Sequence, residues 1–312
     1  MEYADLKSKK IMFIAMLNML IVVLELIFGA LSNSLSLITD ALHNLGDVLA
    51  LFVAFVAAYY ALKAATSKMT FGYIRAEMMA AFVNSLFLCV TMIYVLYEAF
   101  IRFLNPVAID TSSVIAVASI ALVINGISAY LLRENHHLHH HHATSHDHEC
   151  DHDHHEDLNL KAAYLHMLGD AVISLGVVLG AFATRYFDAV FIDPLITFIF
   201  GSYILKSSSN VLKDSFFSLM DANPHDIKKY EELILSFKEI DAVHDIHLTS
   251  PSSNEIYFSA HIVLSSNMSL DEIEKIIEDI RLALKQRFGV THLLIQPESV
   301  KYAQAEQYCL TH

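Results

Sequence analysis

With 312 residues, of which 55% are hydrophobic and only 17% are charged, the chain is far more apolar than a typical soluble protein, in which about 25% of residues are charged. The formal net charge of −14 argues against nucleic acid as a partner, because phosphate binding needs basic stripes. Three cysteines, Cys89, Cys150 and Cys309, are too few and too scattered for a disulfide-stapled secreted fold.

Most apolar residues lie between Ile11 and Leu205, in stretches of about 20 residues, the length at which a helix crosses a bilayer. After residue 213 the composition becomes that of a soluble protein. We therefore expect an all-α six-helix transmembrane domain over residues 1–213, followed by a cytoplasmic α+β domain over residues 214–312. The predicted membrane helices are 10–31, 35–62, 75–102, 112–133, 158–185 and 188–207, the last continuing towards Phe217.

The basic residues predict the orientation of these helices. Six spans place both termini on one side, and only Arg102 and Arg185 fall on the other side. The positive-inside rule then places both termini and the C-terminal domain in the cytoplasm. The small size and the lack of eukaryotic sorting features favour a bacterial inner (plasma) membrane. The basic residues on the cytoplasmic side are Lys7, Lys9, Lys10, Lys63, Lys68, Arg75, Arg133, Lys161 and Lys213.

Two of the predicted membrane helices carry the same polar motif, H-x-x-x-D. The second helix contains His43 and Asp47 in TDALHNLGDV, and the fifth contains His166 and Asp170 in YLHMLGDAV. Ionisable groups inside a bilayer cost roughly 2.5–3.5 kcal/mol each on insertion scales, so they are functional candidates. Residues four apart lie on one face of a helix, so each motif presents an imidazole and a carboxylate together.

The depths of the two motifs agree. At about 1.5 Å per residue, His43 and Asp47 lie roughly 12 and 18 Å below the outer surface of a hydrocarbon core about 30 Å thick. Counted from the inner surface, His166 and Asp170 lie roughly 18 and 12 Å below the outer one. Both pairs reach the same middle layer. Two nitrogen and two oxygen ligands there suit a tetrahedral zinc site.

Other polar residues in the predicted spans are less specific. Asp40 lies one turn from His43, and three roles stay open for it: supporting the metal ligands, relaying protons or capping the helix. The remaining polar residues are interpreted as helix-packing groups, because polar side chains hydrogen-bond between membrane helices. They are Asn18, Glu25, Asn84 and Asn125.

A histidine-rich segment joins the fourth and fifth spans. The segment 134–157 has no apolar periodicity and is expected to form a disordered cytoplasmic loop. Its histidines, with Cys150 as a soft ligand, favour a metal-gathering role over that of a dispensable polar loop. These residues are His136, His137, His139, His140, His141, His142, His146, His148, Cys150, His152, His154 and His155.

The C-terminal part predicts alternating helices and strands. The pattern favours a helix at 225–239, strands at 243–249 and 255–264, a helix at 269–287 and a strand at 291–297. Ser269, with Glu272 three residues later, predicts a capping box at the start of the second helix. The tail ends with Cys309 and His312, three residues apart, a spacing at which the two side chains could bind one soft metal ion.

Several motifs resemble the cation diffusion facilitator family, in its zinc-exporting branch. They are SLSLITDALHNLGDVLALF, TFGYIRAEMMAAFVN, EAFIRFLNP, LHMLGDAVISLGVV, IDPLITFIFGSYIL and VHDIHL…HIVL…HLLIQPE, which occur in the family's order between about residues 11 and 298. The resemblance implies six membrane helices, a cytoplasmic αββαβ (ferredoxin-like) domain, a homodimer and exchange of Zn²⁺ for protons by alternating access. It implies a transporter rather than an enzyme.

The resemblance also implies roles for individual residues. His43, Asp47, His166 and Asp170 would form the transport site, and His at position 43 matches branches that favour zinc. His244, His261 and His292 match strand positions that often bind a structural or regulatory zinc ion in the family. Cys309 and His312 resemble cysteine-bearing tails of some relatives, although only one thiol is present here.

Three alternatives stay open from the sequence. HHLHH resembles a histidine box of a di-metal membrane enzyme such as a desaturase-like oxidase, but it is embedded in low-complexity Asp/His sequence. A membrane metal sensor that binds zinc without moving it has the same ligands. A transporter of cadmium, cobalt, nickel or iron shares the same fold.

Overall fold

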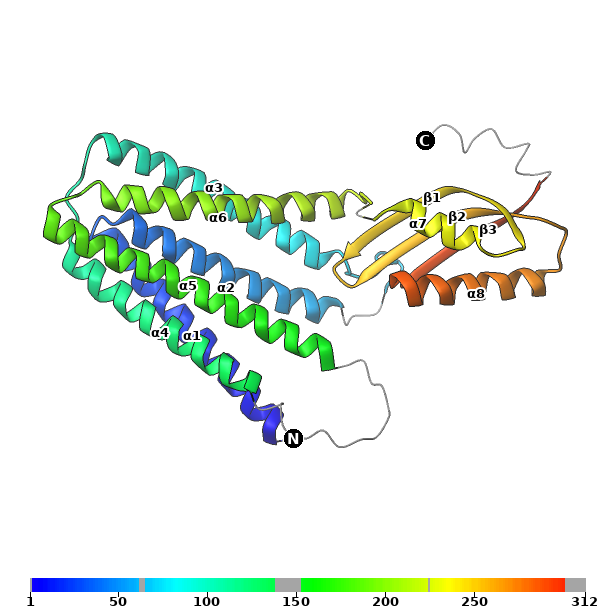
Figure 1. Ribbon diagram of the computed structural model, residues 1–312, viewed down its shortest axis with the longest axis horizontal. Helices are drawn as coiled ribbons and strands as arrows, with labels where there is room; N and C mark the ends of the chain where they lie inside the picture. The colour runs from blue at the N-terminus through cyan, green and yellow to red at the C-terminus, as the bar shows by residue number, and fades with distance from the viewer. Residues whose placement is uncertain (1, 62–64, 138–152, 224, 301–312) are drawn as a thin grey trace. The chain divides into compact units, whose positions relative to one another are not determined.

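The structure is a computed structural model that describes residues 2–61, 65–137, 153–223 and 225–300 (Figure 1). The chain divides into two compact units. The first consists of Met1–Phe52 and Asn84–Asn210, and the second of Val53–Val83 and Val211–His312. Each unit has a hydrophobic cluster of its own, built from helices in the first unit and from helices and a sheet in the second.

Long helices make up the N-terminal two thirds of the described chain. Four of them are long and apolar enough to cross a membrane over Ala76–Leu104, Thr111–Tyr130, Tyr164–Phe187 and Ile192–Leu219, and a shorter apolar stretch covers Met16–Leu31. The expected helical membrane domain is confirmed. The helices are α1 (Glu2–Leu31), α2 (Leu35–Ala61), α3 (Ala76–Leu104), α4 (Thr111–His137), α5 (Asp153–Phe187) and α6 (Ile192–Leu219).

Several helices extend further than the sequence indicated. The end of α4 at His137 and the start of α5 at Asp153 make both ends of the expected 134–157 loop helical. Extending an existing helix adds one hydrogen bond for each residue that is fixed, so a polar segment can continue an apolar helix. Residues 138–152, which include most of the expected metal-gathering histidines, lie outside the described residues. The expected continuation of the last helix towards Phe217 is also seen, because α6 runs to Leu219.

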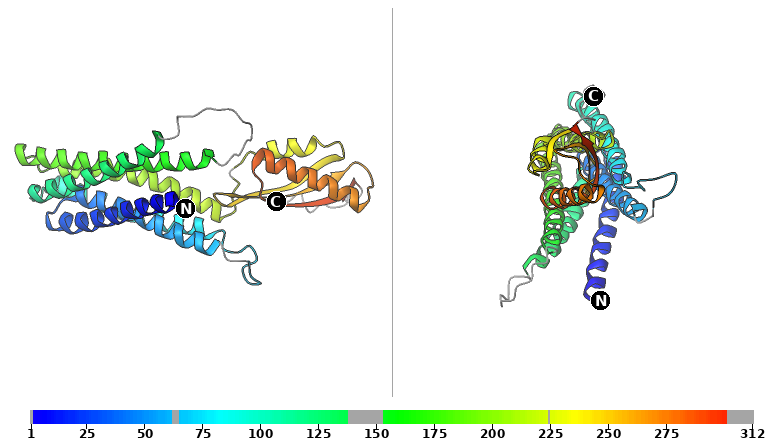
Figure 2. Two further views of the ribbon diagram at one scale, coloured as in Figure 1. Left: turned by 90° about the horizontal axis from the view of Figure 1, so that it is seen from below. Right: turned by 90° about the vertical axis from the view of Figure 1, so that its right-hand side faces the viewer.

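The first unit buries small residues between its helices and turns large apolar residues outwards. Its cluster includes Leu37 of α2, Val114 and Ala118 of α4, and Val177 and Ala181 of α5. The views in Figures 1 and 2 show α4 and α5 side by side. An apolar exterior of this kind suits lipid contact. Exposed apolar side chains on α3 include Phe87, Val90, Ile93 and Tyr94.

The start of α2 is held by a carboxylate from another helix. Asp193, in the first turn of α6, accepts hydrogen bonds from Leu35 N at 2.8 Å and from Ser36 N at 3.2 Å. Ser34 Oγ donates to Asp193 Oδ1 at 2.7 Å. The first N–H groups of a helix have no partners within the helix, and the helix dipole favours a negative charge there. Asp193 therefore fixes the N-terminal end of α2 against α6.

Replacing this carboxylate is expected to weaken the bundle. Asp193→Ala leaves buried N–H groups unpaired, each at a cost of about 1–3 kcal/mol, so we expect a loss of about 2–4 kcal/mol in the free energy of unfolding. Asp193→Asn retains one acceptor oxygen and should lose less. Thermal unfolding of the purified protein in detergent measures both changes. Equal melting temperatures for wild type and Asp193→Ala would contradict this role.

The second unit contains the αββαβ arrangement expected from the sequence. Its elements are α7 (Ile227–Leu235), β1 (Ile240–Ser252), β2 (Glu255–Leu264), α8 (Leu270–Phe288) and β3 (His292–Ser299). The sheet has the order β1-β2-β3, with β1 and β2 antiparallel and β2 and β3 parallel. The predicted capping box is confirmed, because Ser269 N and Oγ both donate to Glu272 Oε2 at 2.8 Å. These hydrogen bonds lower the pKa of Glu272.

Alternation along the strands separates the two faces of this sheet. Phe258, Ala260 and Ile262 of β2 are buried together with Ile234 of α7 and Ile280 of α8. Both helices lie on one side of the sheet in Figure 2. Side chains at the alternate positions of β2 point to the opposite face. The histidines of the strands lie on this second face.

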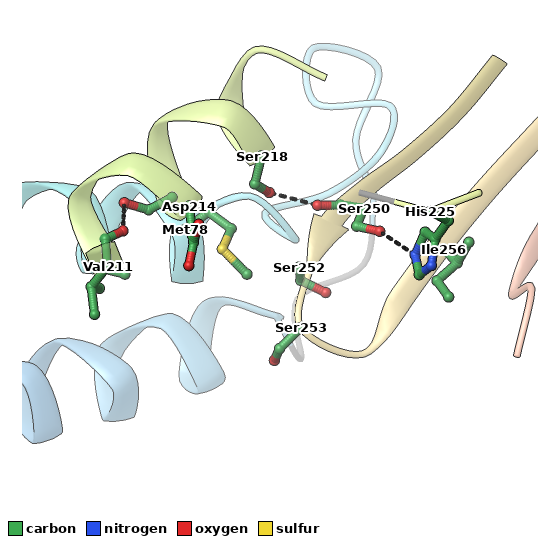
Figure 3. Close-up of a pocket in the computed structure, with 11 residues that line it drawn as sticks. Met78, Val211, Asp214, Ser218, His225, Ser250, Ser252, Ser253 and Ile256 are labelled. Atoms are coloured by element: carbon green, nitrogen blue, oxygen red, sulfur yellow. Dashed lines mark hydrogen bonds between the residues drawn. The ribbon is translucent and has the colours of Figure 1, made fainter. Parts of the chain in front are cut away.

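A cavity of about 410 Å³ lies within the second unit, between the ends of α3 and α6 and the turn that joins β1 to β2 (Figure 3). Its lining is rich in serine. Ser218 Oγ donates to the carbonyl oxygen of Ser250 at 2.6 Å, and Ser250 Oγ lies 3.4 Å from His225 Nε2. These hydroxyl groups are occupied by protein partners. His225 is placed in this cavity lining and is not part of either potential metal-binding group found among the described residues.

Candidate metal centre

The four residues of the two H-x-x-x-D motifs meet between α2 and α5. His43 Nε2 lies 3.6 Å from Asp47 Oδ2 and 3.6 Å from Asp170 Oδ1. His166 Nε2 lies 3.4 Å from Asp47 Oδ2 and 3.7 Å from Asp170 Oδ2. The two imidazole rings are 6.1 Å apart and nearly perpendicular. Each helix thus supplies one nitrogen and one carboxylate ligand to a common centre.

The environment of this centre is suited to holding a cation. One ligand atom from each of His43, Asp47 and Asp170 falls within a group spanning 4.8 Å. One ligand oxygen at this centre, Asp47 Oδ2, is buried without a hydrogen-bond partner, and so is His43 Nδ1, the ring nitrogen that does not face the carboxylates. Buried polar atoms are rarely left unpaired, so such atoms call for a ligand or ordered water. Asp170 is 4% exposed and His166 41% exposed, so the centre has one closed and one open side.

A glycine beside the centre permits close packing of α2 and α3. A Cβ atom at Gly46 would lie 2.6–2.9 Å from three atoms of the Leu88 side chain. The glycine that precedes Asp170, Gly169, has no such neighbour within 4 Å. The L-G dipeptide shared by the two motifs therefore serves helix packing in α2, next to Asp47, but not in α5.

Asp40 lies deep in the first unit. It is fully buried, in the second turn of α2 rather than at its end, and Asp193 and Ser34 already serve the N-terminus of that helix. This placement does not support the capping role. Ser174 Oγ donates to Asp40 Oδ2 at 3.1 Å, and Asn44 Nδ2 lies 3.5 Å from Asp40 Oδ1. Because Asn44 follows His43 directly, Asp40 joins a polar network beside the candidate ligands.

Two domains of known proteins match this chain. Residues 11–220 match the cation efflux transmembrane domain, and residues 222–300 match the cytoplasmic domain of cation efflux proteins. The chain belongs to the cation efflux family. The resemblance drawn from the motifs is confirmed, and this cation efflux protein is a transporter in a membrane rather than a di-metal enzyme.

Curated relatives of this cation efflux protein come from bacteria and animals. The Cadmium, cobalt and zinc/H(+)-K(+) antiporter of Bacillus subtilis is 33% identical over 300 residues, which cover 96% of this chain and 90% of the relative. The metal cation efflux system protein CzcD of Cupriavidus metallidurans is 31% identical over 284 residues, covering 90% and 84%. The proton-coupled zinc antiporter SLC30A8 of Xenopus tropicalis is 27% identical over 300 residues, covering 94% and 79%.

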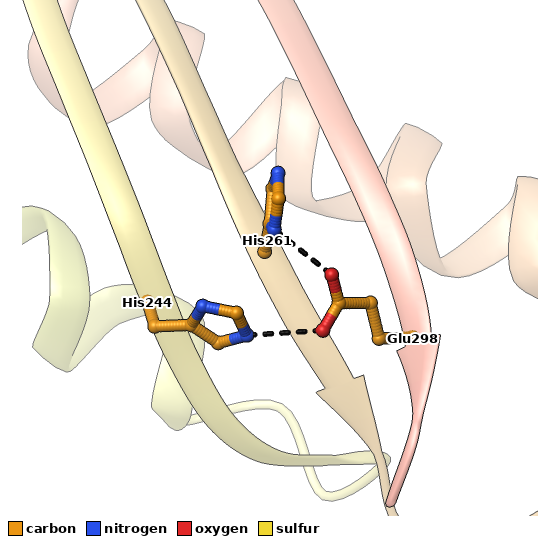
Figure 4. A group of neighbouring side chains, drawn as sticks. All are labelled: His244, His261 and Glu298. Carbon is orange, nitrogen blue, oxygen red and sulfur yellow. Dashed lines mark hydrogen bonds and ion pairs between the residues drawn. The ribbon is translucent and has the colours of Figure 1, made fainter. Parts of the chain in front are cut away.

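A second group of potential ligands lies on the C-terminal sheet of this cation efflux protein, on the face opposite α7 and α8 (Figure 4). Glu298 uses both of its carboxylate oxygens: Oε2 lies 3.1 Å from His244 Nε2, and Oε1 lies 2.8 Å from His261 Nδ1. The two rings are 5.2 Å apart. Glu298 is only 3% exposed. Two imidazoles around a buried carboxylate form a compact donor set of the kind that binds zinc.

The sheet register assembles this group. His244 and His261 are direct partners across β1 and β2, and β3 brings Glu298 alongside Val263. The register of β1 shifts between His244 and His247, and Asp245 has a positive φ of 52° there. Such a bulge re-aims a side chain. The Asp245 carboxylate consequently lies 3.5 Å from His261 Nε2.

The other predicted cytoplasmic ligands are placed differently. His292 packs against Tyr257 and Phe71, with ring centroids 4.8 and 6.4 Å away, and does not join the His244–His261–Glu298 group. Cys309 and His312 lie outside the described residues. Glu298 was not among the ligands expected from the sequence. The sequence marks Glu298 only as a single carboxylate at the end of HLLIQPE. Strand alternation alone does not show that this carboxylate contacts histidines on other strands.

Proposed function

We propose that this cation efflux protein exports zinc from the cytoplasm in exchange for protons, through a transport site formed by His43, Asp47, His166 and Asp170. The observation that carries the proposal is the meeting of two nitrogen and two oxygen donors from α2 and α5, with imidazole-to-carboxylate distances of 3.4–3.7 Å. This donor set matches the preference of zinc for four-coordinate sites built from histidine and carboxylate.

The chemistry of the ligands links the two substrates. Zinc binds neutral imidazole and ionised carboxylate, so the metal displaces protons when it binds and protons displace the metal when they return. Imidazole is the side chain whose unperturbed pKa is nearest to neutral. Because the donors come from two helices, a relative movement of α2 and α5 would change both the geometry of the site and the side from which it is reached. Zinc binding in this exchange thus needs no protein ligands beyond these four residues.

The test is zinc flux in proteoliposomes with an imposed pH gradient. We expect zinc to accumulate on the more acidic side, because protons leave that side as zinc enters it. The limiting zinc ratio should change by about tenfold per pH unit for each proton exchanged, since one pH unit corresponds to about 1.4 kcal/mol per proton. Zinc flux that is the same with the gradient and after its collapse by a proton ionophore would overturn the exchange.

The cargo has a second candidate. The relative from Bacillus subtilis is named for cadmium and cobalt as well as zinc, and the relative from Cupriavidus metallidurans for metal cations in general. We therefore propose cadmium and cobalt as secondary cargo and zinc as the principal one, because two imidazoles favour borderline metals. The inhibition of zinc flux by cadmium and by cobalt, each added as a competitor, measures the order of preference among the three metals.

The assembly and orientation belong to the same proposal. We infer a homodimer in a bacterial plasma membrane, with both termini in the cytoplasm. The match to a cytoplasmic domain after residue 222 and the basic residues on the corresponding side of the helices support this orientation. We also propose that the histidine-rich segment 136–155 gathers metal before transport.

We further propose that His244, His261 and Glu298 bind a structural or regulatory zinc ion. Glu298→Gln removes the charge that both imidazoles contact, so the full-length protein should bind one zinc ion per chain fewer while the transport site keeps its zinc. Metal stoichiometry of the purified protein after dialysis measures this. Glu255→Gln, at the partly exposed start of β2, is the matched control. Unchanged stoichiometry in Glu298→Gln would contradict the cytoplasmic site.

A further inference from the structure

Two carboxylic side chains are buried together next to the proposed transport site, and neither is one of its ligands. Glu25 of α1 and Asp40 of α2 are both 0% exposed. Asn44 bridges them, because its Nδ2 lies 3.2 Å from Glu25 Oε2 and 3.5 Å from Asp40 Oδ1. Ser174 of α5 donates to the other oxygen of Asp40 at 3.1 Å. The packing role expected for Glu25 does not account for a second acid at its side.

Glu25 has an oxygen that the protein leaves unpaired. Its Oε1 atom is buried and has no hydrogen-bond partner, whereas both oxygens of Asp40 have one. Burying an ionised carboxylate without full hydrogen bonding is far more costly than burying the neutral acid. Two carboxylates at close range also disfavour each other's ionised form. The pair is therefore most stable with one bound proton, which removes the charge from one of the two acids.

In the described part of the chain, neither Glu25 nor Asp40 forms an ion pair with a lysine or arginine that could neutralise the pair. The α4 helix, which packs against α1, contributes Asn125 and no ionisable side chain over residues 111–129. The nearest ionisable groups along α2 and α5 are proposed metal ligands, because His43 follows Asp40 by three residues and Asp170 precedes Ser174 by four.

We propose that Glu25 and Asp40 form a proton-binding site, separate from the metal ligands, that holds one proton when the transport site is empty and releases it when zinc binds. The proposal rests on the proposed transport function and names a site for one of the exchanged protons. Asp40 and His43 are three residues apart on α2, about 5–6 Å between Cβ atoms, so a dication at His43 acts strongly on the pair.

The exchange balances in charge and protons. Zinc brings two positive charges to the transport site, the Glu25–Asp40 pair changes from one net negative charge to two, and the proton passes to water. When zinc leaves, the pair takes up one proton from the other side of the membrane. The buried site thus changes its total charge by less than the charge of the metal, which lowers the cost of moving a dication through a protein interior.

The decisive measurement counts the protons released when zinc binds to the full-length protein in detergent, by calorimetry in buffers of different ionisation enthalpy. We expect Glu25→Gln to release about one proton fewer per zinc than wild type. The slope of log Kd for zinc against pH should fall by about one, a tenfold smaller change in affinity per pH unit. Asp40→Asn should do the same, and the double variant should lose no second proton, because the pair shares only one.

Glu98→Gln is the control for loss of a carboxylate elsewhere in the helices. Glu98 forms an ion pair with Arg102 at 3.0 Å, away from the pair, and its substitution should leave the proton count unchanged. Glu25→Asp retains a carboxyl group and should restore the wild-type count. A Glu25→Gln protein that binds zinc and releases as many protons as wild type would overturn the proposal, as would a double variant that loses two.

Infrared spectroscopy of the wild-type protein gives an answer even if Glu25→Gln fails to fold or to bind zinc. A carbonyl stretching band of a protonated carboxylic acid should be present without zinc and vanish on zinc binding. Absence of that band in the zinc-free protein near neutral pH would overturn the proposal. Wild type that binds zinc but does not move it would instead overturn the proposed function, so the two failures are distinguishable.

Discussion

Zinc flux through His43→Ala and Asp170→Ala is expected to fall by more than about 100-fold, to the background of empty vesicles. Even residues that only support metal ligands cost roughly 10–100-fold in affinity or activity when replaced, and these two bind the metal in the proposed site. His43 Nε2 lies 3.6 Å from Asp170 Oδ1, so each variant removes a donor from the contact that joins α2 to α5. Flux into proteoliposomes at saturating zinc and an imposed pH gradient measures the loss.

The controls for this result separate loss of a ligand from loss of the fold. His225→Ala and Asp214→Ala replace the same residue types outside the transport site, and their flux should stay within about twofold of wild type, as is usual for substitutions away from structural features. Size-exclusion chromatography should show the same oligomer for all four variants. Substantial zinc flux through His43→Ala would mean that the metal crosses by another route.

The membrane helices and the grouping of the four proposed transport ligands could be predicted because each depends on a short-range pattern. An apolar run of about 20 residues is fixed by the thickness of the bilayer, and the H-x-x-x-D spacing puts two ligands on one helix face without any tertiary information. Depth counting then sufficed to pair the second span with the fifth. The distances among His43, Asp47, His166 and Asp170 agree with that expectation.

Contacts between distant segments could not be predicted in this way. Asp193 holds the start of α2 from 158 residues away, and no local pattern marks it. In the cytoplasmic domain, strand alternation puts His292 and Glu298 on one face, but only the register shows which of them reaches His261. His292 pairs with Tyr257, four residues and about 13 Å along β2 from His261, so Glu298 takes the place that His292 was expected to fill.

The choice of metal should depend on the residue at position 43. We expect His43→Asp to retain transport but to lower the preference for zinc over cadmium by at least about tenfold, measured as the ratio of kcat/KM values for flux with a fixed pH gradient. The substitution converts a site with two nitrogen donors into one with a single nitrogen and three carboxylates. Imidazole suits zinc, whereas carboxylate ligands accept a wider range of harder or larger cations.

Geometry adds to this chemical effect of His43→Asp. The side chain of His43 is 19% exposed and contacts both Asp47 and Asp170, so a shorter carboxylate there leaves room for a larger ion and for water as an additional ligand. Asp47→Glu is the matched control, because it keeps the donor type at the neighbouring position. It should lower the rate without widening the choice of metal. A zinc-to-cadmium ratio that is unchanged in His43→Asp would show that selectivity is set outside the four proposed transport ligands.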